Sequence, residues 1–135
     1  MQAEISERER LMQYKYTIDA IPPSNNRFSG RKNVWEYREE KKNWERLVSL
    51  KCRPRPSQPL EHAEVKLTYY FRTRGRRDPD NYSGKFILDG LVKSGIISDD
   101  SFGHIELRLC GDYDKNNPRT EIEITERKIN HDKYE

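Results

Sequence analysis

The stretch from residue 74 to residue 100 reads RGRRDPDNYSGKFILDGLVKSGIISDD and combines an arginine-rich turn, five aspartates and a run of apolar residues at helical spacing. Carboxylates held close together repel one another and take up protons unless a cation neutralises them. Mg²⁺ prefers oxygen ligands and can activate a water molecule against a phosphodiester. Asp78, Asp80 and the pair Asp99-Asp100 are therefore candidate ligands of a divalent metal.

The neighbours of these aspartates are basic, since Arg74, Arg76, Arg77 and Lys85 lie in the same stretch. A cluster of positive charges indicates an anionic substrate. Metal-binding carboxylates beside a basic cluster are the combination expected of a nuclease.

A plainer interpretation of the same residues remains open. Asp78-Pro79-Asp80-Asn81 is also good turn chemistry, and Asp80 or Asn81 could cap the helix that follows. Capping uses one carboxylate and leaves Asp78, Asp100 and the arginines as solvated surface. Perturbable carboxylates are often structural, so the residues alone do not separate the two interpretations.

Two motifs lie far apart in the chain, and residues 77–100 hold the second of them. The first is Ile21-Pro22-Pro23-Ser24-Asn25-Asn26-Arg27; the second is Arg77-Asp78-x-Asp80-Asn81, then Lys85, Asp89-Gly90-Leu91, Lys93, Gly95 and Asp99-Asp100. Together, and in this order, they resemble the RusA-type Holliday-junction endodeoxyribonucleases of bacteria and their prophages. The resemblance covers about residues 16 to 126.

The resemblance implies a homodimer that resolves four-way DNA junctions by paired symmetric nicks during recombination and repair. It implies Mg²⁺ as the cofactor, with Mn²⁺ as a substitute. Its three essential aspartates fall on Asp78, Asp80 and Asp100, and its active-site lysine falls on Lys85. One departure is that Lys85 follows Asp80 by five residues where the family spacing is four, which places an inserted residue near Gly84.

In physical terms, the three aspartates would hold the metal, and Lys85 would offset negative charge on the phosphorane or on the leaving oxygen. The DNA backbone is expected to contact the arginines and the polar turn after Pro23, because phosphates draw on arginine and small polar side chains. Affinity should then fall steeply with salt. The expected DNA-binding residues are Arg74, Arg76, Arg77, Asn25, Asn26 and Arg27.

The chain has 135 residues, enough for a single domain with a modest core. Its hydrophobic share of 33% is low and its charged share of 36% is high, which favours a thin core completed in a dimer. The two cysteines have no metal-site or disulfide-framework spacing. No apolar run approaches the ~20 residues of a membrane span, so we expect a cytoplasmic protein without a membrane partner.

The hydrophobic pattern predicts strands where apolar residues alternate and helices where they recur every three or four positions. The strands are expected at 14–21, 64–72, 105–109 and 121–124, and the helices at 34–50 and 81–94. Asn33 and Glu36 form a variant capping box for the first helix, whose apolar stripe includes Val34, Tyr37 and Trp44. A connector with several prolines occupies 51–59.

These elements predict an α+β fold in the order β-α-β-α-β-β, with a mixed four-stranded sheet and two helices packed on one face of a homodimeric protein. The last two strands are expected to pair across the loop at 111–118. The predicted divisions are an N-terminal arm at 1–13, a single nuclease domain at 14–127 and a charged tail at 128–135.

A length argument bears on the predicted metal site. A helix of 12 to 14 residues between Asp80 and Asp100 spans about 20 Å. An extended connector at 96–99 covers about 13 Å at most, so it is hard to bring Asp100 back to Asp78 and Asp80 within one chain. Antiparallel helices of two subunits would instead bring Asp78 and Asp80 of one chain to Asp100 of the other. A helix that begins after Gly84 weakens this argument.

Two other functions stay open on the sequence. A catalytically silent junction-binding dimer would bind DNA without metal and lose nothing when Asp80 becomes asparagine. A Mg²⁺ nuclease acting on other branched or single-stranded DNA would cleave without preference for four-way structure.

Overall fold

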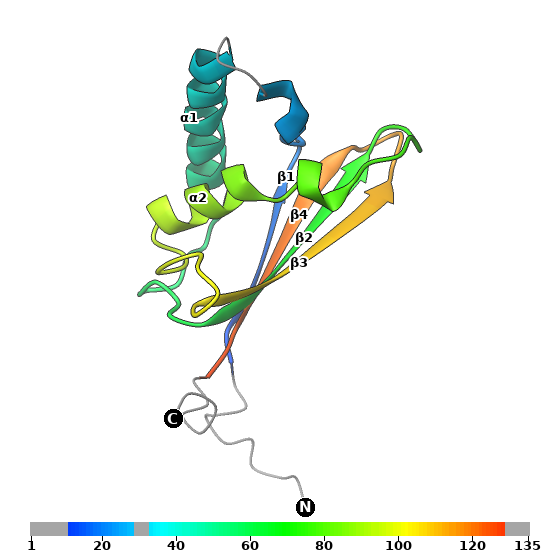
Figure 1. Ribbon diagram of the computed structural model, residues 1–135. Coiled ribbons are helices and arrows are strands. Elements are labelled where there is room, and N and C mark those ends of the chain that lie inside the picture. Colours follow the sequence, from blue (N-terminus) through cyan, green and yellow to red (C-terminus); the bar gives the residue numbers. More distant parts are fainter. Residues whose placement is uncertain (1–10, 29–32, 129–135) are drawn as a thin grey trace, which may run out of the picture.

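The structure is a computed structural model that describes residues 11–28 and 33–128. The α-helices and strands follow the predicted order, with 3₁₀ turns before each helix (Figure 1). Their bounds are β1 Gln13–Ile18, η2 Asn25–Phe28, α1 Val34–Lys51, β2 Ala63–Phe71, η4 Pro79–Asn81, α2 Lys85–Lys93, β3 Ile105–Tyr113 and β4 Arg119–Glu126. The predicted α+β class is confirmed.

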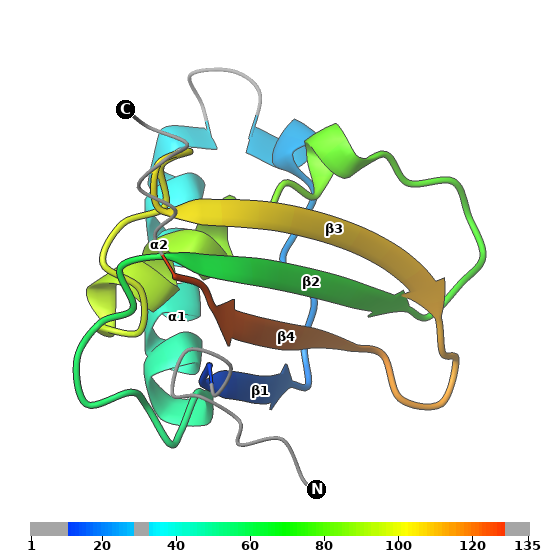
Figure 2. The same ribbon diagram turned by 90° about the horizontal axis from the view of Figure 1, so that it is seen from below.

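The four strands form one mixed sheet in the spatial order β1-β4-β2-β3 (Figure 2). Strand β2 pairs with β3 in parallel and with β4 antiparallel, and β1 pairs antiparallel with β4. The prediction that the last two strands pair with each other is wrong, because β2 lies between them.

Strand β2 lies between β3 and β4 and has no exposed residue. Its consecutive residues Leu67, Thr68 and Tyr69 are all buried, which suits a strand flanked by strands on both edges. The chain leaves β2, crosses through α2 and returns in β3 parallel to β2. Strand β4 then takes the remaining edge of β2.

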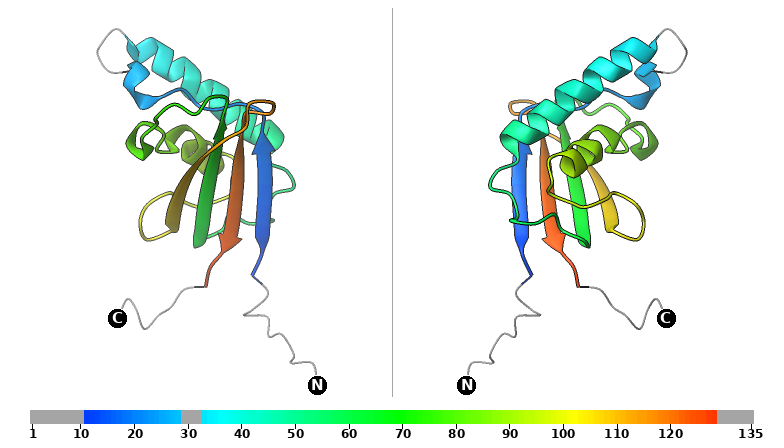
Figure 3. Two further views of the ribbon diagram at one scale, coloured as in Figure 1. Left: turned by 90° about the vertical axis from the view of Figure 1, so that its right-hand side faces the viewer. Right: turned by 90° about the vertical axis from the view of Figure 1, so that its left-hand side faces the viewer.

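Both helices cover the same face of the sheet, as predicted (Figure 3). Helix α2 buries most of its apolar residues there, and α1 contributes Trp44 and Val48. The helices approach closely at Gly90, where a Cβ atom would lie 2.9 Å from Cγ2 of Val48. The sheet side of the core includes Val65, Leu67, Ile122 and Ile124.

Helix α1 begins at the predicted residue but without the predicted cap. Asn33 occupies the N-cap position, yet its side chain makes no capping hydrogen bond. Val34, expected on the apolar stripe, is exposed, as is the neighbouring Trp35. The buried stripe therefore starts further along, at the half-buried Tyr37.

Helix α2 is shorter than the prediction of 81–94. Gly84 precedes it with φ of +84°, and a Cβ atom there would lie 2.5 Å from Cδ1 of Leu67. Only glycine fits this left-handed turn against β2. The nine-residue helix spans about 14 Å, so the length argument against closing the site within one chain loses its premise.

The predicted terminal segments fall mostly outside the described residues, at 1–10 and 129–135. Gln13, assigned to the N-terminal arm, already belongs to β1. Within 11–28 and 33–128, no helix is long and apolar enough to cross a membrane. Cys52 and Cys110 are both free thiols.

Candidate active site

The segment 77–84, here called the aspartate loop, connects the end of β2 to α2 and carries Asp78 and Asp80. Asp78 is half-buried and its Oδ1 accepts a hydrogen bond from Nε of Arg76 at 3.2 Å. Asp80 is exposed. The N-cap of α2 is Gly84, and so the plain interpretation in which Asp80 or Asn81 caps this helix is wrong.

Asn25 joins the two sequence motifs in space. Its Nδ2 donates to the backbone oxygen of Asp80 at 3.0 Å and to Oγ of Ser83 at 3.2 Å. The partners of Asn25 lie 55 and 58 residues away along the chain. The amide predicted to contact DNA is therefore engaged in holding the aspartate loop.

Four residues on α1, on α2 and after α2 form a second group, here called the helix patch, namely Tyr37, Lys85, Asp89 and Asp100. Nζ of the exposed Lys85 lies 5.6 Å from the centroid of the Tyr37 ring. The interaction with the Tyr37 side chain raises the pKa of Lys85, and the charges of Asp89 and Asp100 raise it further. Lys85 is therefore a stable cation at neutral pH.

The pKa of Asp89 also depends on the charges of the helix patch. Partial burial raises the pKa of the Asp89 carboxyl, and the negative charge of Asp100 acts in the same direction. The positive charges of Lys41 and Lys85 lower it. The charge of Asp100 therefore acts on both Lys85 and Asp89 within a single chain.

Aromatic rings support the helix patch. Tyr37, Phe28 and Phe86 contact one another with ring centroids 5.3 to 5.9 Å apart. Oη of Tyr37 is buried and has no hydrogen-bond partner of normal geometry. The sequence placed Tyr37 only on an apolar stripe, because its spacing on α1 carries no sign of the contact with Lys85.

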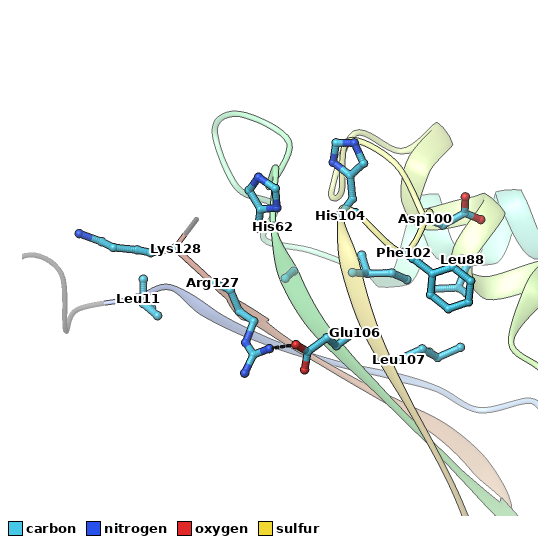
Figure 4. Close-up of a pocket in the computed structure, with 13 residues that line it drawn as sticks. Leu11, His62, Leu88, Asp100, Phe102, His104, Glu106, Leu107, Arg127 and Lys128 are labelled. Carbon is cyan, nitrogen blue, oxygen red and sulfur yellow. Dashed lines mark ion pairs between the residues drawn. The ribbon is translucent and has the colours of Figure 1, made fainter. Parts of the chain in front are cut away.

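Asp100 lies on the rim of a pocket of about 870 Å³ beside Leu88 and Phe102 (Figure 4). Within 11–28 and 33–128, no three His, Cys, Asp or Glu residues lie close enough to hold a metal ion. Within one chain the charge of Asp100 acts on Lys85, but Asp78, Asp80 and Asp100 are not gathered into one metal-binding group. The donor set of a single chain does not fit a three-carboxylate Mg²⁺ site.

The predicted DNA-binding arginines differ in their contacts within the chain and in their exposure to solvent. The guanidinium of Arg77 donates to the backbone oxygens of Thr73 and Gly75 and lies 4.3 Å above the Phe71 ring. Arg74 lies over a tyrosine ring but is exposed, and the Arg76 side chain is 88% exposed. Arg77 is thus part of the loop's framework, whereas Arg74 and Arg76 face solvent.

The other two predicted DNA contacts lie in the turn η2. Arg27 and Asn26 are both exposed there. The guanidinium of Arg27 lies 5.9 Å from the ring of Phe28, which belongs to the aromatic support of the helix patch. Arg27 therefore lies beside the aromatic support of the helix patch.

Two histidines that the sequence left without a role meet at the large pocket. The rings of His62 and His104 stack with centroids 5.7 Å apart, and Nδ1 of His104 lies 2.8 Å from the backbone oxygen of Glu61. Scattered single histidines gave no sequence signal of this pairing. The hydrogen bond accounts for the orientation of His104.

Both sequence motifs lie within the part of the chain that matches a known protein family. No curated protein matched the chain. The family model described as Endodeoxyribonuclease RusA matches residues 18–125, which include Asn25, the aspartate loop and the helix patch. The chain belongs to the RusA family of endodeoxyribonucleases.

Proposed function

We propose that this chain is a Mg²⁺-dependent endonuclease that resolves four-way DNA junctions by paired symmetric nicks, acting as a homodimer. The observation that carries the proposal is the contact of Asn25 with the aspartate loop, because it joins the two motifs of an endodeoxyribonuclease family into one site. A two-fold dimer would present two equal sites to the two strands that must be cut.

Asp78 and Asp80 of one chain, with Asp100 of a second chain, are the residues proposed to hold Mg²⁺. When bound, the ion would supply a water of lowered pKa and polarise the phosphate. The second chain matters because the described residues of one chain do not bring three carboxylates together.

Lys85 is the group proposed to touch the reacting phosphodiester. Its ammonium stays charged beside Tyr37 and Asp89, and a fixed positive charge stabilises the negative charge that develops on a leaving oxygen. Arg74, Arg76 and Arg27 are exposed and would contact the junction backbone. Arg77 would act indirectly, by shaping the loop that presents Asp78.

Cleavage of a synthetic four-way junction tests the proposal. The full-length protein is incubated with Mg²⁺ and the junction, in parallel with a linear duplex of the same sequence and with the Asp80→Asn variant. We expect symmetric nicks in the junction, an intact duplex, and a rate for the variant that is lower by a factor on the order of 10² or more.

Two results would contradict the proposal. Tight junction binding without nicking, in either Mg²⁺ or Mn²⁺, would identify a silent DNA-binding protein. Equal cleavage of flap, single-stranded and four-way substrates would identify a nuclease of broader action.

A further inference from the structure

Helix α1 has two tryptophans in opposite surroundings. Trp44 is 2% exposed and belongs to the core, whereas Trp35 is 69% exposed. About two and a half helical turns separate them, so their side chains leave the helix on opposite sides. Tryptophan is on average a strongly buried residue, and its ring suits the contact surface of a partner. The bare ring of Trp35 is therefore a candidate binding contact.

Basic residues continue the side of α1 on which Trp35 lies. Three cations follow the tryptophan at intervals of three or four residues, which is the spacing of one helix face. All three are exposed, and none of them forms an ion pair with another described residue. This surface, here called the outer stripe, consists of Trp35, Arg38, Lys42 and Arg46.

The outer stripe faces away from the rest of the molecule. Helix α1 lies at the periphery, with α2 and the sheet to one side of it (Figures 1 and 3). The inner side of α1 meets α2 where Val48 approaches Gly90. Tyr37, which contacts Lys85, also lies on the opposite side of the helix from Trp35. The outer stripe is thus separate from the helix patch.

The composition of the outer stripe indicates what kind of ligand would fit it. Glu39 is an exposed acid on the same side of α1, so three cations outweigh one carboxylate there. Successive cations are about 6 Å apart along the helix axis, which spreads them along α1 instead of gathering them around one small anion. A row of positive charges beside an aromatic ring is the arrangement that binds a nucleic acid strand.

A membrane surface fits this helix less well. A helix that lies in a membrane interface buries a continuous apolar face in the lipid. The apolar side of α1 is already used in the core, through Trp44 and Val48. The outer stripe offers lipid a single ring at one end, and its other members are charged.

We propose that the outer stripe binds a DNA strand, whose phosphates contact the three cations and one of whose unpaired bases stacks on Trp35. The proposal rests on the proposed function only in taking DNA as the ligand. The bound strand is a different segment from the one at Lys85, because the two surfaces lie on opposite sides of α1. The stripe therefore adds affinity for branched DNA outside the cleavage site.

Binding of a labelled thymidine oligonucleotide to the full-length protein tests the charges. Fluorescence anisotropy is measured in EDTA, where no metal-dependent cleavage occurs. Lys42→Gln should raise the dissociation constant at least about threefold, and Lys51→Gln, an exposed lysine of α1 off the stripe, by less than about twofold. Glu39→Gln should have the opposite sign and tighten binding, since it removes the one negative charge of the stripe.

The salt dependence counts the phosphates that the stripe holds. A single strand contributes about 0.7 to the slope of log affinity against log salt for each neutralised phosphate. The triple variant Arg38→Gln/Lys42→Gln/Arg46→Gln should therefore lower that slope by about 2. Circular dichroism of each variant checks that the exposed substitutions leave the protein folded.

Tryptophan fluorescence tests the stacked base. Thymidine oligonucleotide should quench the emission of the wild type, and Trp35→Ala should abolish this quenching while the emission of Trp44 remains. Trp35→Ala should also raise the dissociation constant at least about fivefold. An abasic oligonucleotide of equal length has the phosphates without the bases, so it should bind the wild type and Trp35→Ala equally.

Three results would overturn the inference. The first is a triple variant that keeps the wild-type salt slope, and the second is a Trp35→Ala variant that binds the thymidine strand as the wild type does. The third is emission from Trp35 that changes with protein concentration in the absence of DNA, because it would identify the stripe as a contact between copies of the chain.

Failure of the proposed function looks different. A chain that binds the oligonucleotide through the outer stripe but cuts no four-way junction keeps this inference and refutes the nuclease. A chain that cuts junctions, and whose triple variant binds DNA with wild-type affinity and salt slope, keeps the nuclease and refutes the inference.

Discussion

The aspartate loop and the helix patch are the two halves of the candidate site, and they hold their charges by different means. The loop keeps Asp78 and Asp80 near solvent and is fixed by polar contacts, from Asn25 to its backbone and from Arg76 to Asp78. The helix patch places Lys85 against Tyr37, whose ring belongs to an aromatic cluster.

The difference separates two requirements of a phosphodiester-cutting site. Carboxylates that bind a cation must be reachable from solvent, and the aspartate loop provides this. A lysine that stabilises developing charge must be well positioned, and its contact with the Tyr37 ring favours this. If the comparison is right, damage to the loop and damage to the patch will have distinguishable consequences.

The largest effect on the cleavage rate is expected from a substitution in the helix patch. Lys85→Met should slow single-turnover cleavage of a four-way junction by about 10² to 10³, because a positioned donor to developing charge is lost. Lys93→Met is the matched control, since Lys93 lies on the same helix and pairs with Glu45 at 3.4 Å. Equal cleavage rates for the two variants would show that Lys85 takes no part in the reaction.

The turn that joins the two halves comes next. Gly84→Ala should lower the free energy of unfolding by about 2 to 4 kcal/mol, from the left-handed φ together with overpacking against Leu67. Gly95→Ala is the control, because Gly95 has φ of +76° but no atom within 4 Å of an added Cβ. Gly95→Ala should lower the free energy of unfolding by about 1 to 2 kcal/mol. Equal losses for the two variants in denaturant titrations would show that the clash between residue 84 and Leu67 is relieved.

The polar support of the loop should have a smaller effect. Asn25→Ala should slow junction cleavage about tenfold, as the loss of two hydrogen bonds loosens the aspartate loop, and should leave junction affinity nearly unchanged. A double-mutant cycle with Ser83→Ala measures the coupling. A clear loss of junction affinity would instead show that Asn25 contacts DNA.

The smallest effect concerns the charge of Asp89. Its pKa is raised in the folded state, so the folded protein binds this proton more tightly than the unfolded chain does, and the stabilisation present at low pH is lost as pH rises. Asp89→Asn should therefore raise the free energy of unfolding at pH 7 by less than about 1 kcal/mol. The gain should vanish near pH 3, and Glu39→Gln, an exposed acid on α1, should show no such trend.

Local patterns predicted much of the fold. Alternating apolar residues located the four strands, and helical spacing located both helices to within a few residues. The predicted spans of β3 and β4 were too short, and that of α2 was too long. The error at α2 came from Gly84, whose backbone conformation depends on its neighbour Leu67. Propensity alone cannot report such a contact.

The sequence named the candidate residues of the site, but it did not indicate which of them contact one another. The two motifs named Asn25, Asp78, Asp80, Lys85 and Asp100, and the family match includes all of them. The sequence assigned Asn25 to DNA and overlooked Tyr37, because both contacts join segments distant along the chain. A hydrogen bond or ring contact across such a separation leaves no periodic signal.

The sequence by itself determined which residues face the core and which carry the charge, because side-chain direction repeats every two positions in a strand and every three to four in a helix. Only the tertiary structure decided that β2 lies between β3 and β4, that Asn25 holds the aspartate loop, and that the charge of Asp100 acts on Lys85. Periodicity specifies a face and not a neighbour. The neighbour is chosen when the whole core packs, by competition among all the strands and loops for the same buried space.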